Sequence, residues 1–210
     1  MTNYNYTNHW DHKYQTTEDS KLGWFEDNPQ STLQLLEECN LSKDATILNV
    51  GAGTTTLIDK LVKEGFTNVI ANDISEVALN KLQQRIKNNF NYSLNCIVDD
   101  LTNPTTLNSI DKVDIWIDRA VLHFFLKKEE QQAYFNLVKK TVTKGGYVLI
   151  AVFALDGALK CCGLDLKRYD LKMLQENLGD TFQLIDSFNH TYVNPFGGER
   201  PYIYTLFKKQ

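Results

Sequence analysis

The sequence predicts an α/β domain in which a mostly parallel β-sheet carries helices on both faces. Short apolar runs alternate along the chain with segments whose apolar residues recur at helical spacing. Strands that alternate with helices favour a parallel sheet, because each connecting helix packs back onto a face of the sheet. The length of 210 residues and the hydrophobic fraction of 42% fit a single domain with its own core.

Five apolar runs predict the central strands, at residues 46–50, 68–72, 94–98, 113–117 and 147–153. After the first run, Leu57 and Leu61 recur at helical spacing, and after the second, Ser75 can cap a helix. Two further helices are predicted over residues 129–142 and 171–178, and two late strands over residues 182–189 and 202–208. This order of elements describes a sheet whose strand ends share one edge.

The first forty residues lie outside this alternation and are rich in aromatic side chains, among them Trp10, Tyr14, Trp24 and Phe25. Two compatible interpretations stay open. The segment is a helix packed on the outside of the core, or it is a lid over a bound ligand. In either case we predict a helical amino-terminal cap over residues 1–40.

Composition and charge exclude several classes of function. Twenty-two basic and twenty-six acidic residues give a net charge of −4, which argues against a nucleic-acid acceptor, because duplex-binding proteins present a basic face. The apolar run over residues 147–155 is too short to cross a bilayer, and the polar first residues lack the apolar core of a secretory signal. We therefore expect a cytoplasmic protein without membrane association.

The four cysteines are scattered, and the four histidines do not follow a zinc-binding spacing. Free thiols in a reducing compartment are expected, and no metal site is predicted. None of these features defines an oligomeric state.

The clearest chemical motif follows the first strand, where Asn49-Val50-Gly51-Ala52-Gly53-Thr54-Thr55 leads into a helix. Glycines permit a tight turn and a close approach of ligand to backbone, and the helix that follows presents free N–H groups. A dinucleotide fingerprint would place a third glycine where Thr56 stands, and the sequence contains no Walker motif. The missing third glycine disfavours a nicotinamide dehydrogenase.

Acidic residues follow the next two strands. Asp73 ends the second strand at the distance from the glycine turn at which a carboxylate accepts both hydroxyls of a ribose. Asp99 and Asp100 follow the third strand and suit an exocyclic amine. In open α/β sheets, ligands bind beyond the carboxyl ends of the strands. Together these residues predict a ligand that contains a nucleoside.

With these motifs the chain resembles class I S-adenosylmethionine-dependent methyltransferases over roughly residues 9–207. The resemblance rests on Asn49-Val50-Gly51-Ala52-Gly53, Asp73, Asp100 and the turn Lys144-Gly145-Gly146-Tyr147. It implies a Rossmann-like, seven-stranded, mostly parallel sheet with the last strand antiparallel. It also implies S-adenosyl-L-methionine as cofactor and S-adenosyl-L-homocysteine as product. Asn49 departs from the family pattern, because it stands where an acid usually meets the cofactor's ammonium group, and its amide contributes no charge.

Shorter motifs resemble two narrower groups. His9-Trp10-Asp11-x-x-Tyr14, Gly23-Trp24-Phe25, the run Asp118-Arg119-Ala120-Val121-Leu122-His123-Phe124 and Ala154-Leu155-Asp156-Gly157 resemble a bacterial subgroup of small methyltransferases. The amino-terminal motifs also resemble eukaryotic lysine methyltransferases. Those have Asp-Lys-Gly-Thr near the position where this chain has Asp118-Arg119-Ala120-Val121, so a protein lysine is the alternative acceptor.

The resemblance assigns a set of cofactor contacts along the strand ends and the cap. They are Trp10, Tyr14, Trp24, Asn49, Gly51, Ala52, Gly53, Thr55, Asp73, Ile74, Asp100, Leu101 and Asp118. We divide the single domain, residues 1–210, into the cap (1–40), a cofactor-binding core (41–155) and a substrate-facing part (156–210).

Three residues after the fourth strand are the catalytic candidates. Asp118 is expected to orient the cofactor's amino-acid end or the acceptor. His123 is expected to act as a base near neutral pH, or to be a half-buried structural histidine. Arg119 is expected to pair with a carboxylate of cofactor or substrate, or to form a salt bridge with Asp118 or Asp114.

An antiparallel last strand would bring the loop at residues 194–201, with Phe196 and Arg200, to the edge of the sheet that holds the site. The segment at residues 156–169 falls on the same edge, so Cys161 and Cys162 either line the pocket or pack as small apolar residues. The leading hypothesis is methyl transfer to an N, O or S atom of a small molecule. The alternatives are a protein lysine methyltransferase and a non-catalytic cofactor-binding module.

Overall fold

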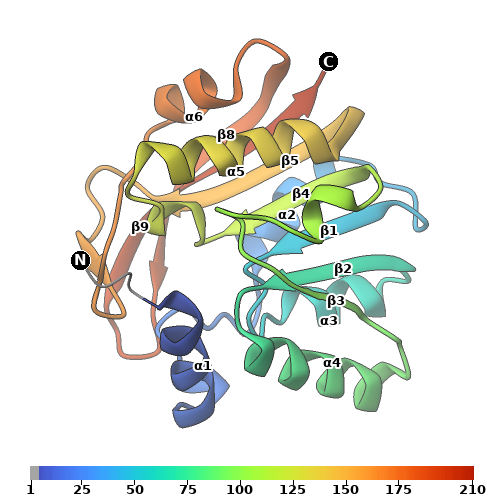
Figure 1. Ribbon diagram of the computed structural model, residues 1–210, viewed down its shortest axis with the longest axis vertical. Helices are drawn as coiled ribbons and strands as arrows, with labels where there is room; N and C mark the ends of the chain where they lie inside the picture. Colours follow the sequence, from blue (N-terminus) through green and yellow to red (C-terminus); the bar gives the residue numbers. More distant parts are fainter. Residues whose placement is uncertain (1–4) are drawn as a thin grey trace.

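The computed structural model describes residues 5–210 and has the predicted α/β architecture (Figure 1). Its seven-stranded sheet has the order β3-β2-β1-β4-β5-β9-β8. The strands are β1 (Thr46–Val50), β2 (Asn68–Asp73), β3 (Asn95–Val98), β4 (Val113–Arg119), β5 (Val142–Phe153), β8 (Phe182–Val193) and β9 (Glu199–Lys209). Strands β1 to β5 pair in parallel, and β9 pairs antiparallel with both β5 and β8. The predicted fold class is confirmed.

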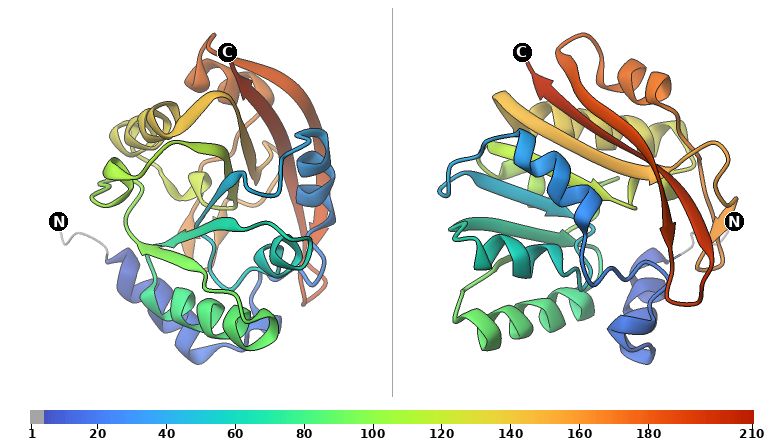
Figure 2. Two further views of the ribbon diagram at one scale, coloured as in Figure 1. Left: turned by 90° about the vertical axis from the view of Figure 1, so that its right-hand side faces the viewer. Right: turned by 180° about the vertical axis from the view of Figure 1, so that it is seen from behind.

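Helices cover both faces of the sheet (Figure 2). The helices α2 (Gln30–Glu38), α3 (Leu57–Lys63) and α4 (Glu76–Phe90) pack on one face, and α5 (Lys128–Thr141) and α6 (Leu171–Leu178) pack on the other. Successive strand residues serve opposite layers, as a period of two requires. Ile47 lies in the first layer and Leu48 in the second, and both are fully buried. Burial on both faces explains why the parallel strands are continuously apolar.

The helix α1 (Tyr6–Thr16) lies beside α4 at the edge of the sheet that holds the carboxyl ends of the parallel strands (Figure 2). The short elements are η1 (Asp19–Lys21), η2 (Leu107–Ser109), η3 (Leu122–Phe124) and the hairpin of β6 (Lys160–Cys161) with β7 (Leu164–Asp165). No helix among the described residues is long and apolar enough to span a membrane.

The predicted cap divides into two parts. The helix α2 packs against the sheet and buries Leu35 completely, as an ordinary layer helix does. By contrast, α1 and the residues up to Phe25 lie over the strand ends, where Trp10 meets Phe124 at 5.1 Å between ring centroids. The interpretation as a helix packed on the core therefore fits α2, whereas the lid over a ligand stays a prediction for the segment up to Phe25; residues 1–4 lie outside the described residues.

Two local predictions have different outcomes. Ser75 caps α4, because its Oγ accepts a hydrogen bond from the Ala78 N–H at 3.1 Å. The predicted turn at Gly145 and Gly146 is wrong, because both glycines lie inside β5 at a shift of its register with β4. Gly145 has φ +81° there, as a strand irregularity of this kind permits.

Candidate active site

One cavity brings most of the predicted site residues together. It encloses about 980 Å³, its open mouth included. The predicted residues that line it are Trp10, Tyr14, Trp24, Gly51, Asp73, Ile74, Asp100, Leu101, Arg119 and His123. A second cavity, of about 550 Å³, is lined by Asn49, Ala52 and Thr55 and shares Trp24, Gly51 and Arg119 with the first. Gly53 and Asp118 line neither of these two cavities.

The glycine turn needs both of its glycines. Gly51 has φ +54° and Gly53 has φ +52°, a region that favours glycine. A Cβ on Gly51 would overlap the Val121 side chain, and a Cβ on Gly53 would overlap the Tyr14 hydroxyl. The close approach that the sequence predicted for a ligand is thus made at Gly53 by the amino-terminal segment itself.

The Asp73 carboxylate joins the glycine turn to the start of α4. Oδ2 accepts a hydrogen bond from the Gly53 N–H and Oδ1 accepts one from the Ser75 N–H, both at 2.8 Å. Burial raises the pKa of Asp73 to about 6, and the two N–H groups oppose that rise. A carboxylate has about four acceptor positions, so each oxygen keeps capacity for a hydroxyl on the cavity side.

The two acids after β3 have different roles. Asp99 is buried and accepts hydrogen bonds from the backbone of Thr105 and Leu107, which shapes the loop towards η2. Asp100 is half-buried, and its Oδ1 accepts from the N–H and hydroxyl of Thr102, both at 2.8 Å. The Asp100 carboxylate is therefore held in place at the cavity, next to the buried Leu101.

Asp118 is completely buried on the side of the sheet that α5 covers. Its Oδ1 accepts from the Val121 N–H at 2.9 Å, and its Oδ2 accepts from the Leu122 N–H at 3.1 Å and the Tyr134 hydroxyl at 2.7 Å. Burial raises the pKa of Asp118 to about 6. Its position does not favour direct contact with a ligand. Asp118 instead holds the turn that presents His123 to the cavity.

Arg119 points to the opposite side of the sheet and pairs with the amino-terminal segment. Its Nε lies 3.1 Å from the Glu26 carboxylate, and its Nη1 donates to the Trp24 carbonyl at 2.7 Å. The predicted salt bridge to Asp118 or Asp114 is wrong, because neighbouring residues of a strand project to opposite faces. The Asp114 carboxylate instead accepts a hydrogen bond from the Thr46 N–H at 2.8 Å.

The surroundings of this ion pair keep it charged. Burial alone would lower the pKa of Arg119, but Tyr202 and Glu26 outweigh that effect and raise it. The guanidinium lies 4.8 Å from the ring centroid of Tyr192 and 5.3 Å from that of Tyr202. Arg119 thus borders both cavities as a fixed cation that the cap partly neutralises.

His123 lines the cavity as a neutral side chain. It is 1% exposed, and burial followed by the charge of Arg119 lowers its pKa to about 3. This pKa does not fit a base poised near neutral pH. Among the described residues, neither of its ring nitrogens has a hydrogen-bond partner. A neutral imidazole offers one donor and one acceptor, so His123 can hold a polar group of a ligand.

Aromatic rings, several of them from the amino-terminal segment, form one wall of the cavity. Trp10 meets Trp24 edge to face with 5.5 Å between ring centroids, and Tyr14 meets Trp24 at 5.8 Å. Phe124 and Tyr202 complete this wall, and the predicted site residues omitted both. Their position was the available signal, since Phe124 follows β4 and Tyr202 pairs with Phe153 at the end of β5.

The loop between β8 and β9 lies at the predicted edge of the sheet but does not line the cavity. Phe196 is 73% exposed, and neither it nor Arg200 borders either of the two cavities. The lining residues from the late part of the chain are Tyr202 and Cys161. Cys162 does not line the cavity.

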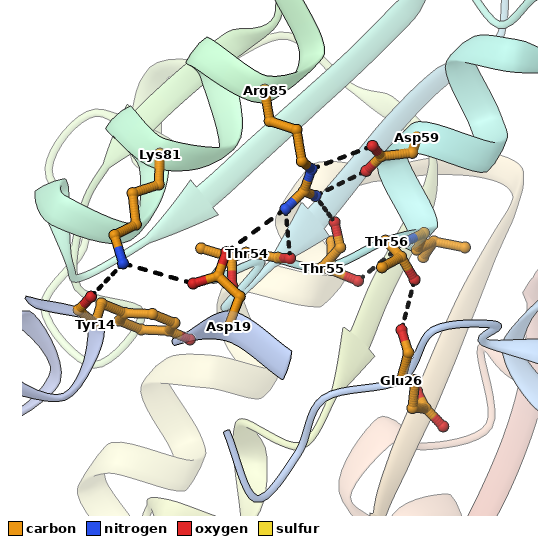
Figure 3. A network of polar contacts seen from close by, with 10 residues as sticks. Tyr14, Asp19, Glu26, Thr54, Thr55, Thr56, Asp59, Lys81 and Arg85 are labelled. Carbon is orange, nitrogen blue, oxygen red and sulfur yellow. Dashed lines mark hydrogen bonds and ion pairs between the residues drawn. The ribbon is translucent and has the colours of Figure 1, made fainter. Parts of the chain in front are cut away.

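A network around Arg85 ties α4 to the glycine turn and to the cap (Figure 3). The guanidinium binds the Asp59 carboxylate through Nε at 3.1 Å and Nη2 at 2.7 Å. It also donates to the carbonyls of Thr54 at 3.1 Å and Thr55 at 2.5 Å, and lies 3.8 Å from the Asp19 carboxylate. The half-buried guanidinium of Arg85 thereby fixes the loop that follows the glycines.

Two further contacts continue this network into the cap (Figure 3). Lys81 donates to the carbonyl of Tyr14 and pairs with Asp19 at 3.5 Å. The hydroxyl of Thr56 donates to the carbonyl of Glu26 at 2.7 Å. The segment that carries the aromatic wall is therefore anchored on both sides of the glycine turn.

Comparisons with known proteins agree with this geometry. A family model described as a methyltransferase domain matches residues 41–193. The protein is similar to two curated proteins named EEF1A lysine methyltransferase 2. The one from Danio rerio is 25% identical over 133 residues, covering 60% of this chain and 56% of the relative. The one from Mus musculus is 27% identical over 106 residues, covering 47% and 43%. The chain spans about half the length of these relatives.

Solved structures share the fold. A SAM-dependent methyltransferase from Anabaena variabilis superposes with a TM-score of 0.77 at 14% identity, covering 99% of this chain and 96% of that one. The N-methyltransferase NodS from Bradyrhizobium japonicum, in complex with S-adenosyl-L-homocysteine, has a TM-score of 0.70 at 14% identity, covering 97% of each chain.

Proposed function

The chain belongs to the methyltransferase domain family and uses S-adenosylmethionine, and on this premise we propose that it methylates an N, O or S atom of a small molecule. One observation carries the proposal. The cavity that holds Asp73 and Asp100 continues into the aromatic wall and encloses about 980 Å³, its open mouth included. An aromatic wall beside a few convergent polar groups is typical of small-molecule sites, so the wall can hold an acceptor next to the cofactor.

Four residues suit the cofactor. Asp73 would accept the ribose hydroxyls, and Asp100 the adenine amine, with Leu101 against the ring. Asn49 would receive the ammonium group, because its buried Oδ1 has no hydrogen-bond partner while its Nδ2 donates to the Ile117 carbonyl at 3.2 Å. An amide there contributes a hydrogen bond but no charge. In this proposal residues 41–155 bind the cofactor, and the flanking segments bind the acceptor.

Methyl transfer needs little from the protein beyond the alignment of the two reactants and the exclusion of water. When bound, the cofactor supplies an electrophilic methyl group on a sulfonium. The residues of the chain would bind the acceptor, align it and exclude water. His123 would hold a polar group of the acceptor, and Trp10, Trp24 and Tyr202 would enclose it. Because the pKa of His123 is about 3, acceptors that carry a free lone pair without help from a base fit best.

A protein lysine is the second candidate, and the similarity to the EEF1A lysine methyltransferases favours it. The chain has Arg119 and Ala120 where the resembled pattern has lysine and glycine. An acidic protein of net charge −4 would attract a basic protein partner.

Incubation of a cell extract with the enzyme and methyl-labelled S-adenosylmethionine separates the two acceptor classes. Before incubation the extract is split by size into metabolites and proteins. We expect label in the metabolite fraction, and less of it with His123→Ala although that variant still binds S-adenosyl-L-homocysteine. Label confined to proteins would replace the small-molecule proposal with the lysine alternative.

A further inference from the structure

The hairpin of β6 and β7 carries two adjacent cysteines in a tight turn. Cys161 pairs with Leu164, so the turn consists of Cys162 and Gly163 alone. Both have positive φ, +55° and +82°. Two-residue hairpin turns of this kind favour Asn-Gly or Gly-Gly. A cysteine backbone in the left-handed region has a conformational free energy roughly 1 kcal/mol above that of the usual regions. A non-glycine residue that the fold holds there points to a function.

The turn brings the two sulfur atoms together at the cavity. The Sγ atoms of Cys161 and Cys162 are 3.6 Å apart, and both residues are half-buried free thiols. Cys161 also lines the cavity, as Tyr202 does. A group attached to the Cys161 sulfur would therefore enter the cavity next to Tyr202, on the side that the proposed function gives to the acceptor.

The environment makes one of the two thiols the nucleophile. The contact with the Cys162 sulfur lowers the pKa of Cys161, burial opposes this, and the charges of Arg200 and Arg119 add to the lowering. The neighbouring sulfur and burial raise the pKa of Cys162. Thiolates rather than thiols attack disulfides, and Cys161 is the one of the two that lines the cavity, so Cys161 is the attacking sulfur and Cys162 the resolving one.

The other two cysteines provide an internal contrast. Cys39 is buried in the core, and burial raises its pKa to about 12. Burial also raises the pKa of Cys96, to about 11. Neither residue has a sulfur neighbour among the contacts of the described chain, and a thiol with a raised pKa forms less of the reactive thiolate.

We propose that Cys161 and Cys162 form a redox-active dithiol that reacts with low-molecular-weight disulfides, and that the mixed disulfide formed first, on Cys161, occupies the cavity that this residue lines. The Cys161 thiolate attacks one sulfur of the disulfide, forms a mixed disulfide and releases one thiolate, which takes up a proton. The Cys162 thiol then loses its proton and attacks the Cys161 sulfur, which releases the second thiol. The two cysteines are oxidised to one disulfide, and the small disulfide is reduced to two thiols.

The resulting bond is readily reversible. Adjacent Cα atoms are about 3.8 Å apart, below the ~4.4–6.8 Å that disulfides usually span. A strained disulfide has a more oxidising potential and is reduced easily. The dithiol thus reports the thiol–disulfide balance without locking the protein permanently.

Oxidised glutathione is the probe, applied to the full chain and followed by intact-mass and peptide analysis after alkylation. The wild type is expected to pass through a glutathione adduct on Cys161 and end two hydrogen atoms lighter. Cys162→Ser is expected to stop at the adduct. Cys161→Ser is expected to react at least about tenfold more slowly, and a Cys39→Ser/Cys96→Ser double variant should match the wild type.

Two results would overturn the proposal. One is an adduct on Cys39 or Cys96 that forms as fast as that on Cys161. The other is unchanged reactivity in Cys161→Ser. The Cys162→Ser protein that carries the glutathione adduct should still bind S-adenosyl-L-homocysteine. Lost binding would reject the placement of the adduct on the acceptor side of the cavity. These readouts need no acceptor, so they stand or fall separately from the proposed function.

Discussion

Asp73 offers the sharpest test of the cofactor site, because its protonation should control affinity. Its pKa of about 6 lies above the ordinary value of 3.8, so the carboxylate dominates at neutral pH and the neutral acid in mild acid. A ribose hydroxyl donates to the carboxylate, and ligand binding therefore favours the ionised form. Affinity for S-adenosyl-L-homocysteine should fall as pH drops through 6, by about tenfold between roughly pH 7.5 and pH 5.

The size of the Asp73→Ala effect follows from the contacts that the carboxylate would make. Two hydrogen bonds from ribose hydroxyls to a charged acceptor contribute about 1.5–3 kcal/mol each. At 1.4 kcal/mol per factor of ten, their loss weakens binding about 10²- to 10⁴-fold. The variant also leaves the N–H groups of Gly53 and Ser75 without their acceptor, so its melting temperature should fall as well.

Calorimetry with S-adenosyl-L-homocysteine, at both pH values, measures both effects. Asp73→Asn keeps the shape of the side chain but does not titrate, so its affinity should be weaker and independent of pH. Asp186→Asn, on β8 at the far edge of the sheet, should behave as the wild type. Wild-type affinity in a folded Asp73→Ala protein would refute the ribose assignment. A pH dependence that survives in Asp73→Asn would assign the titration to another group.

Three further substitutions test the turn, the anchor and the acceptor wall. Gly53→Ala should lower the free energy of unfolding by roughly 1–2 kcal/mol or more, because its φ is +52° and its Cβ would overlap the Tyr14 hydroxyl; an unchanged melting temperature would contradict this contact. Arg85→Ala should speed proteolysis of residues 17–28 and weaken S-adenosyl-L-homocysteine binding. Lys87→Ala on the same helix should do neither, and equal effects would deny Arg85 its anchoring role. His123→Ala should lower the rate of methyl transfer about tenfold or more at unchanged cofactor affinity, since one hydrogen bond is worth about 1.5 kcal/mol. Loss of methyl transfer and cofactor affinity together would indicate a structural role for His123.

The part of the cavity that holds the glycine turn and Asp73 was predictable because its signals are local. A strand that ends in glycines, and a following strand that ends in Asp73, can be recognised from apolar runs and their terminators. The sheet topology then brings these ends together without any long-range detail. Ser75 was predictable for the same reason, since a cap is recognised within one helical turn.

The acceptor half was not predictable to the same degree, because distant segments build it. The partner of Arg119 is Glu26, and no pattern in the sequence links the two. The incorrect salt bridge to Asp118 had a simpler cause, since the alternation of a strand already separates adjacent side chains. The turn predicted at Gly145 and Gly146 was wrong because glycine suits a turn and a strand irregularity equally well.

The two halves of the cavity nevertheless depend on each other through the amino-terminal segment. Trp10 and Trp24 of this segment form the wall that we propose receives the acceptor, and Tyr14 of the same segment lies against Gly53. A ligand that binds only the docked arrangement stabilises it by the free energy of its own binding. Cofactor binding should therefore complete the acceptor wall. Changes at Trp10 or Trp24 would alter the choice of acceptor, whereas changes at Tyr14 would weaken binding of both ligands.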